Sequence, residues 1–150
     1  MDRPPRDASA PLLTREMVIL GLFQGLGVLL LVTVGFSWAI ENLDEQQSRA
    51  FGFATLVAGN LSLILANRSI EQPLWRSLRR PNPNLWWVIA GATLLLFVTL
   101  YLPGVRNLLR FEALSGPHLG LAIGLGALGL LWAEAIRWAL RSLGQRLRRG

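Results

Sequence analysis

The residues most able to do chemistry are three polar side chains that lie inside long apolar stretches: Gln24, Asn60 and Glu134. Because burial of such groups away from water costs free energy, each is expected to pair with another group or to serve a function. Asn60 lies near the middle of its stretch, and its amide oxygen suits a hard cation. The other interpretation is a hydrogen bond between two helices, worth about 1 kcal/mol in lipid. Gln24 has the same two interpretations, and its position nearer one end of its stretch favours the hydrogen bond.

Glu134 is the only carboxylate inside these apolar stretches, and Arg137 follows it three residues later. Residues at this spacing share one face of a helix, so the sequence predicts an intrahelical ion pair. The alternative is a carboxylate that couples proton movement to transport, but the arginine-rich surroundings favour the ion pair. His118 is the only histidine, and its position after Pro117 in an expected loop argues against a metal site built around it.

Other chemistry has little support in the sequence. There is no cysteine, nucleotide-binding loop, nucleophile triad or Cys/His cluster. We therefore expect no catalytic site and no bound cofactor in this chain alone. The formal net charge of +6 is compatible with nucleic-acid binding, but the arginines lie at the ends of apolar stretches rather than on one face of a soluble fold. We therefore expect no nucleic-acid partner.

Four long apolar stretches must position these side chains. The 150-residue sequence is 52% hydrophobic and 16% charged, and its charges cluster between the stretches. Each stretch is close to the roughly 20 residues that cross the hydrocarbon core of a bilayer. Four stretches cannot close a barrel, and lipid offers no partner to an open sheet edge, so they are predicted to be helices. The predicted fold is an all-α polytopic membrane protein with a four-helix bundle at 17–140. Its expected parts are a cytoplasmic segment at 1–16, spans at about 17–40, 50–67, 85–102 and 119–140, and a basic cytoplasmic tail at 141–150.

Small residues recur at helical spacing in the first and last stretches. Gly21 and Gly25 form one Gly-x-x-x-Gly pair, and Gly120 and Gly124 form another. This spacing lets two helices approach closely in lipid. We therefore predict that these four glycines are helix-packing positions.

The distribution of arginine predicts the orientation of the chain. Lysine is absent, and of the 15 arginines 12 lie before the first stretch, between the second and third, and from Arg137 onward. The other two gaps hold the remaining 3. Because positively charged loops stay on the cytoplasmic side, both termini are expected in the cytoplasm and the protein in the cell membrane.

Short strings along the chain resemble a known family. Residues 1–6, Met-Asp-Arg-Pro-Pro-Arg, resemble the cytoplasmic segment that follows the sixth transmembrane helix of P-type cation-transporting ATPases. Further matches resemble parts of that family's eighth, ninth and tenth helices, in the same order, at residues 49–51, 59–61, 67–69, 101–103 and 134–137. The likeness covers nearly the whole chain, and the region that it indicates is calcium-pump-like.

The resemblance implies the region of the seventh to tenth helices, which supports the six-helix cation transport core and begins and ends in the cytoplasm. In calcium-pump relatives one side chain of the eighth helix, often Glu or Gln, is a cation ligand. Asn60 falls at the corresponding position. The Asn60 side chain carries no charge and is shorter than that of Glu or Gln, so it would be a weaker ligand. The identity of the transported ion therefore stays open.

The sequence differs from the family pattern in one major respect. The family's phosphorylated Asp-Lys-Thr-Gly-Thr motif does not occur in this sequence. The chain alone is therefore not expected to hydrolyse ATP, and ATP and Mg²⁺ would belong only to the complete pump. We expect either a separated C-terminal piece or a truncated pump gene, whose partners are the bilayer and other pump helices.

Two alternatives to a pump domain stay open. The first is a free-standing four-helix transporter, although such exporters rely on a carboxylate deep in the first helix, where this chain has Gln24. The second is a small membrane adaptor that docks a partner through its arginine-rich loops.

Overall fold

The structure, a computed structural model, describes residues 15–68 and 83–147. Within these ranges the chain forms helices and no strand: α1 (Arg15–Asn42), α2 (Glu45–Arg68), α4 (Pro83–Tyr101), α5 (Pro103–Leu109) and α6 (Gly116–Leu147). This confirms the all-α fold class. Most of the predicted N-terminal segment, the arginine-rich gap after α2 and the last three residues of the tail lie outside the described residues.

Three of these helices are long and apolar enough to cross a membrane: Met17–Asn42, Glu45–Asn67 and Gly116–Ala139. The third predicted stretch has a different form, because Leu85–Tyr101 is followed by Pro103–Leu109 at an angle of 79°. The described chain therefore has three candidate membrane spans, or four if the bent pair counts as one span.

The bend between α4 and α5 follows from Pro103. Leu102 has an extended backbone, with φ −77° and ψ 117°, and the proline is the first residue of α5. Proline disfavours a helical conformation in the residue before it but is well suited to the first turn of a new helix. The predicted stop at residue 102 is thus a change of direction, after which one more short helix forms.

The turn between α1 and α2 is short and polar. Glu45 begins α2, five residues before the apolar stretch expected at residue 50, and the carboxylate pairs with Arg49 one turn later. An acidic residue in the first turn is favourable for a helix, as is a Glu–Arg pair at this spacing. The Ser48 hydroxyl also donates to the backbone oxygen of Asp44 at 2.9 Å. These local interactions extend α2 beyond its apolar part.

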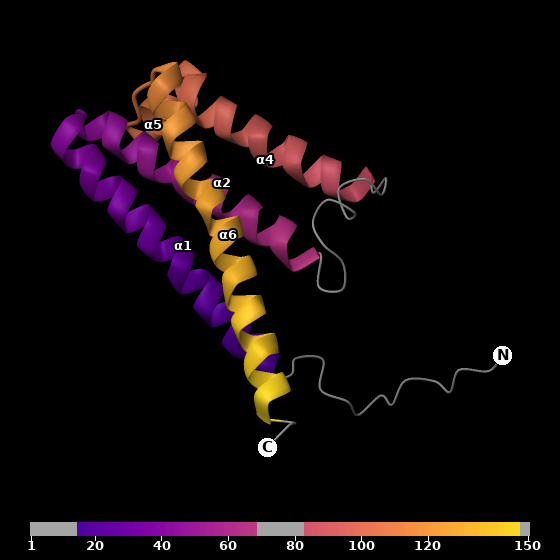
Figure 1. Cartoon of the computed structure of the whole chain (residues 1–150). Coiled ribbons are helices and arrows are strands. Elements are labelled where there is room, and N and C mark those ends of the chain that lie inside the picture. Colours follow the sequence, from indigo (N-terminus) through magenta and orange to yellow (C-terminus); the bar gives the residue numbers. More distant parts are fainter. Residues whose placement is uncertain (1–14, 69–82, 148–150) are drawn as a thin grey trace.

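Helices α1, α2 and α6 form the body of the molecule. The most extensive contact is between α2 and α6, and α1 packs against both. Figure 1 shows the start of α1 and the end of α6 at one end of this group, and the α1–α2 turn at the other. Near that turn, α4 approaches α2 and the loop before α6 completes a small apolar core, where the Tyr101 hydroxyl donates to the Leu114 oxygen at 3.1 Å.

Glycine allows the three helices to approach closely at mid-length. A Cβ atom placed on Gly126 of α6 would lie 2.5 Å from the Cβ of Ala58 and 2.7 Å from the backbone oxygen of Thr55, both on α2. It would also lie 2.8 Å from the backbone nitrogen of Gly59. A Cβ on Gly59 would in turn meet Val28 of α1 at 2.8 Å. We call the contact line of Val28, Gly59 and Gly126 the glycine seam.

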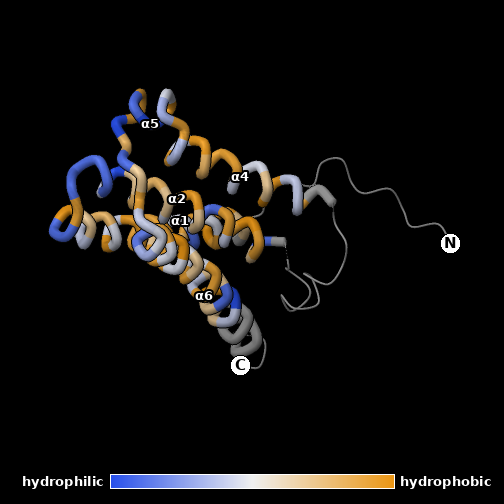
Figure 2. Tube along the Cα trace, turned by 90° about the horizontal axis from the view of Figure 1, so that it is seen from above, coloured by the Kyte–Doolittle hydropathy of each residue, from blue (hydrophilic) through white to orange (hydrophobic). Residues whose placement is uncertain are grey.

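The outer faces of the helices are apolar. Leu, Ile, Val, Phe and Trp side chains are exposed along α1, α4 and α6, while the buried core is built mainly from Ala and a few larger residues. Figure 2 shows hydrophobic residues along the helices and hydrophilic ones gathered near the α1–α2 turn, near α5 and toward the C-terminal end of α6. This distribution is the reverse of a water-soluble bundle and fits a surface solvated by lipid.

Candidate functional site

Asn60 lies on the face of α2 that points away from the glycine seam. It is exposed, as are Leu56 and Ile64 one turn to either side, whereas its neighbour Gly59 is buried. No hydrogen bond joins the Asn60 side chain to the described part of the chain. The amide is therefore presented outward near the middle of an apolar helix, where a polar group is costly without a partner.

Gln24 has the opposite environment. Its side chain is 1% exposed, and its Nε2 atom has no hydrogen-bond partner among the described residues. Gln24 lies one turn before Val28, whose side chain contacts the seam, so the amide is enclosed by the three-helix body. A buried donor without a partner costs about 1–3 kcal/mol. The hydrogen bond favoured for Gln24 is thus not made by this nitrogen within the described chain.

We predict that Gln24→Leu increases the stability of the chain. Leucine fills similar space and removes the buried amide, so the free energy of unfolding should rise by about 1 kcal/mol. Thermal unfolding in detergent micelles, followed by circular dichroism, measures the change. Gln46→Leu, at an exposed position in the first turn of α2, is the control and should have no stabilising effect. A clear loss of stability in Gln24→Leu would show that the amide has a partner, such as an enclosed water.

Glu134 and Arg137 form the ion pair that their spacing predicts. Arg137 Nη2 lies 2.7 Å from Glu134 Oε1. The Arg137 side chain is only 7% exposed, while Glu134 is 43% exposed. The carboxylate therefore neutralises a guanidinium that the fold has buried, and a buried charge depends strongly on such a partner.

The four glycines predicted as packing positions lie on the surface. A Cβ atom placed on Gly21, Gly25, Gly120 or Gly124 would meet nothing within 4 Å. These residues therefore do not bring the described helices together. Their predicted role stays a prediction for contacts with helices outside this chain.

The glycines and small residues that do pack the body were missed by the sequence analysis. On α6 the buried small residues recur every three or four positions, at Ala122, Gly126, Gly129 and Ala133. On α2 a similar series runs through Ala54, Ala58, Ser62 and Ala66. A longer repeat of small residues, rather than a single Gly-x-x-x-Gly pair, was the signal that could have identified this interface.

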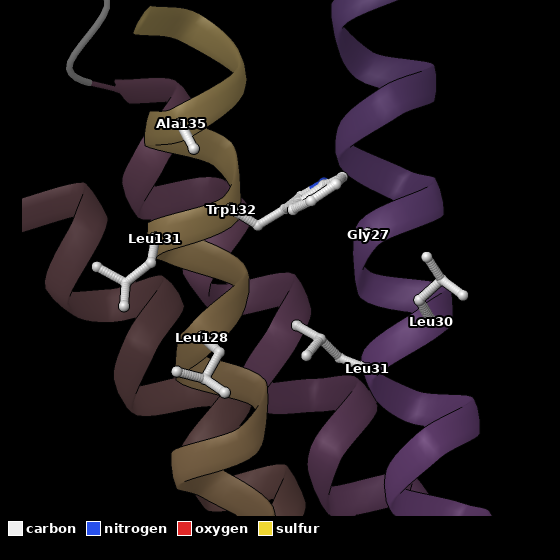
Figure 3. Close-up of a pocket in the computed structure, with 7 residues that line it drawn as sticks. All are labelled: Gly27, Leu30, Leu31, Leu128, Leu131, Trp132 and Ala135. Atoms are coloured by element: carbon white, nitrogen blue, oxygen red, sulfur yellow. The ribbon is translucent and has the colours of Figure 1, made fainter. Parts of the chain in front are cut away.

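Trp132 is a further contact that sequence analysis did not identify. Its indole lies across Gly27 of α1, where a Cβ atom would overlap the ring, and its Nε1 donates to the Phe23 backbone oxygen at 3.1 Å. Figure 3 shows the ring extending from α6 to α1. The side chain thus links the first and last spans directly.

His118 is not in a loop, as the sequence suggested, but in the first turn of α6. Its Nδ1 lies 3.0 Å from the Ser115 hydroxyl, and its ring lies edge-on to Trp38 of α1. Pro117 is accommodated because a proline in the first turn of a helix breaks no internal hydrogen bond.

The comparison with known protein families agrees with this architecture. The family model described as "Cation transporting ATPase, C-terminus" matches residues 1–139. The match includes the proline- and arginine-rich N-terminal motif, all of α1, α2, α4 and α5, and most of α6. Apolar spans and small-residue packing are properties of a multi-pass membrane domain. The chain therefore belongs to the cation-transporting ATPase C-terminus family, the C-terminal membrane region of P-type cation ATPases.

Proposed function

We propose that this chain supports the cation transport core of a P-type ATPase and does no catalysis alone. The observation that carries the proposal is the family match over residues 1–139. The outward position of Asn60 on α2 supports it, because an amide on an apolar helix, with no hydrogen bond to the described residues, is suited to contact with further helices. The exposed Gly-x-x-x-Gly pairs on α1 and α6 offer additional surfaces for such contacts.

Asn60 is also proposed as one ligand of the transported cation. Its carbonyl oxygen is a hard ligand, and hard cations take about six to eight oxygens when they are as large as Ca²⁺. One amide is far from sufficient, so the remaining ligands would come from helices of the transport core. The chain alone is therefore expected to have no measurable affinity for the cation.

Co-expression with the six-helix fragment of a matching P-type pump tests the support role. We expect the chain to co-purify with that fragment and to restore cation-dependent ATP hydrolysis. Asn60→Ala should leave co-purification intact and lower the apparent cation affinity. The matched control is Asn42→Ala at the end of α1, where the side-chain amide donates to the Trp38 backbone oxygen at 2.8 Å.

Two further measurements on the purified chain, proton-coupled transport and salt-sensitive binding of a soluble protein, separate the alternatives. A chain that fails to associate but carries out proton-coupled transport when purified would be a small transporter instead. A chain that binds a soluble protein and releases it in high salt would be an adaptor, because exposed charge contacts are screened by salt.

The proposed orientation, with both termini in the cytoplasm, has a direct test. The sequence contains no cysteine, so single cysteines can be introduced without removing any. In intact cells, a membrane-impermeant maleimide is expected to label Gln46→Cys but not Ser9→Cys or Ser142→Cys. The last two should react only after permeabilisation. The reverse pattern would contradict the orientation that the arginine distribution predicts.

A further inference from the structure

The α5 helix has one apolar side, and most of that side is exposed. Val105, Leu108 and Leu109 are three and four residues apart, so they share one side of the helix. Leu108 is 82% exposed and Leu109 is 40% exposed, while Val105 is partly buried. A surface helix of a water-soluble fold turns its apolar side toward the core. In α5 this side is turned outward instead.

The polar side of α5 lies toward the rest of the molecule. Arg106 and Asn107 line a depression of about 530 Å³ between α5 and the turn that joins α1 to α2. Its other walls come from that turn and from the loop after α5: Asp44, Glu45, Gln46, Phe111 and Glu112. The Glu112 backbone nitrogen donates to the Gln46 oxygen at 3.4 Å, which holds the loop against the turn. The α1–α2 turn and α5 thus lie at the same end of the molecule (Figure 1), with the apolar side of α5 on the other side of its helix.

The length of α4 places α5 near the membrane surface. The 19 residues of α4 give a helix about 28 Å long, close to the roughly 30 Å of the hydrocarbon core. Exposed aromatic side chains, which favour the headgroup region, lie near both ends of α4: Trp86 and Trp87 near its start and Tyr101 at its end. The α5 helix begins two residues after Tyr101 and is inclined at 79° to α4. A helix at that angle to a membrane span runs along the bilayer surface rather than across it.

Charge and shape favour lipid over another protein helix as the partner of this apolar side. Arg106 and Arg110 lie one turn apart, and neither forms an ion pair with a carboxylate in the described part of the chain. Arginines at the membrane surface extend toward lipid phosphates while neighbouring apolar side chains enter the acyl region. Close packing of two helices in lipid instead depends on small residues, and the apolar side of α5 carries only valine and leucine.

We propose that α5 is a membrane-surface helix whose partner is the phospholipid bilayer. Leu108 and Leu109 enter the boundary between headgroups and acyl chains, and Arg106 and Arg110 contact the phosphates. The helix thereby fixes the depth of α4 in the bilayer and holds the loop that leads into α6 at the membrane surface. This role does not depend on whether further pump helices bind the chain.

Spin labels on single cysteines, introduced into the full chain in phosphatidylcholine vesicles, test this position. Collision with oxygen, which concentrates in hydrocarbon, and with a nickel chelate, which stays in water, gives the depth of each label. We expect labels at Leu108→Cys and Leu109→Cys to lie about 5–10 Å into the boundary, and a label at Asn107→Cys to lie on its water side. Exposed Leu95→Cys in α4 is the deep reference, and exposed Gln46→Cys in the α1–α2 turn is the aqueous reference.

A matched pair of variants shows whether the apolar side holds the helix in place. With the label at Leu109→Cys, Leu108→Ser should move the label toward water. Asn107→Ser changes the neighbouring exposed residue on the polar side and should leave the depth of the same label unchanged. The depth of the Leu95→Cys label should stay the same in both variants, which shows that the span is still in place.

Four results would overturn the proposal. Nickel access at Leu108→Cys equal to that at Gln46→Cys would put α5 in water, and a depth equal to that of Leu95→Cys would make α5 part of the span. Protection of Leu108→Cys from both reagents would show that protein, such as a second copy of the chain, covers the apolar side. An unchanged depth of the Leu109→Cys label in Leu108→Ser would show that the leucines do not hold the helix at the surface.

Discussion

Gly126→Leu is expected to separate α6 from α2 and to unfold the three-helix body. Even the first carbon of a new side chain would lie 2.7 Å from the Thr55 oxygen and 2.8 Å from the Gly59 nitrogen. Both are backbone atoms, so no side-chain rotation can relieve the overlap. Overpacking of this kind costs typically about 1–3 kcal/mol, and leucine adds further atoms where the backbones touch. The expected result is a large loss of thermal stability in micelles and faster proteolysis of α6.

Alanine and a second site on α6 provide the controls. Gly126→Ala should also destabilise, but by less than leucine does, because alanine adds only the Cβ atom to the overlap, and its gain in helix propensity over glycine, about 1 kcal/mol, offsets part of the cost. Gly124→Leu lies two residues away on the same helix, with nothing within 4 Å of the new Cβ, and should be tolerated. Equal stability of Gly126→Leu and Gly124→Leu would show that α2 and α6 do not pack through the glycine seam.

Glu134→Gln is expected to destabilise the chain by about 2 kcal/mol. Removing one partner of a fully buried pair costs about 3–5 kcal/mol, and the 43% exposure of Glu134 allows water and salt to reduce this. The change leaves the Arg137 guanidinium buried without its carboxylate. Chemical or thermal unfolding in micelles at neutral pH measures the difference from the unmodified chain.

Two further variants show whether burial of the charge is the cause. Glu134→Gln combined with Arg137→Met should regain most of the lost stability, because an apolar side chain needs no partner. Glu45→Gln breaks the exposed Glu45–Arg49 pair and should cost no more than about 0.5 kcal/mol. Intact stability of Glu134→Gln, together with loss of proton-coupled transport by the purified chain, would instead favour the transporter alternative for this carboxylate.

Several features of the fold are local enough to be predicted from the sequence. The length and hydropathy of the stretches predicted helices that cross a membrane, because in lipid the backbone must satisfy its own hydrogen bonds. The Glu134–Arg137 contact follows from the helical repeat alone, and the structure gives it at 2.7 Å. The resemblance to P-type ATPases rested on short strings, and the family match over residues 1–139 confirms it.

The limits of the helices were less predictable, since polar turns do not reveal where a helix begins. The α2 helix starts at Glu45 because local charge pairing extends it, and the chain bends at Leu102 rather than stopping there. Hydropathy identifies the part of a helix that lies in lipid, and capping and pairing decide the rest.

The sequence alone determined that this is a helical membrane protein of the P-type ATPase family, but only the tertiary structure decided which face of each helix is inside. Gln24 and Asn60 have the same chemistry and similar apolar neighbours, yet Gln24 is buried and Asn60 faces outward. Helices that are apolar on every side carry no amphipathic signal to fix their rotation. The rotation of each helix is set instead by where the backbones can approach one another. Close approach at Gly59 and Gly126 in the glycine seam leaves Gln24 inside the three-helix body and Asn60 on its outer surface.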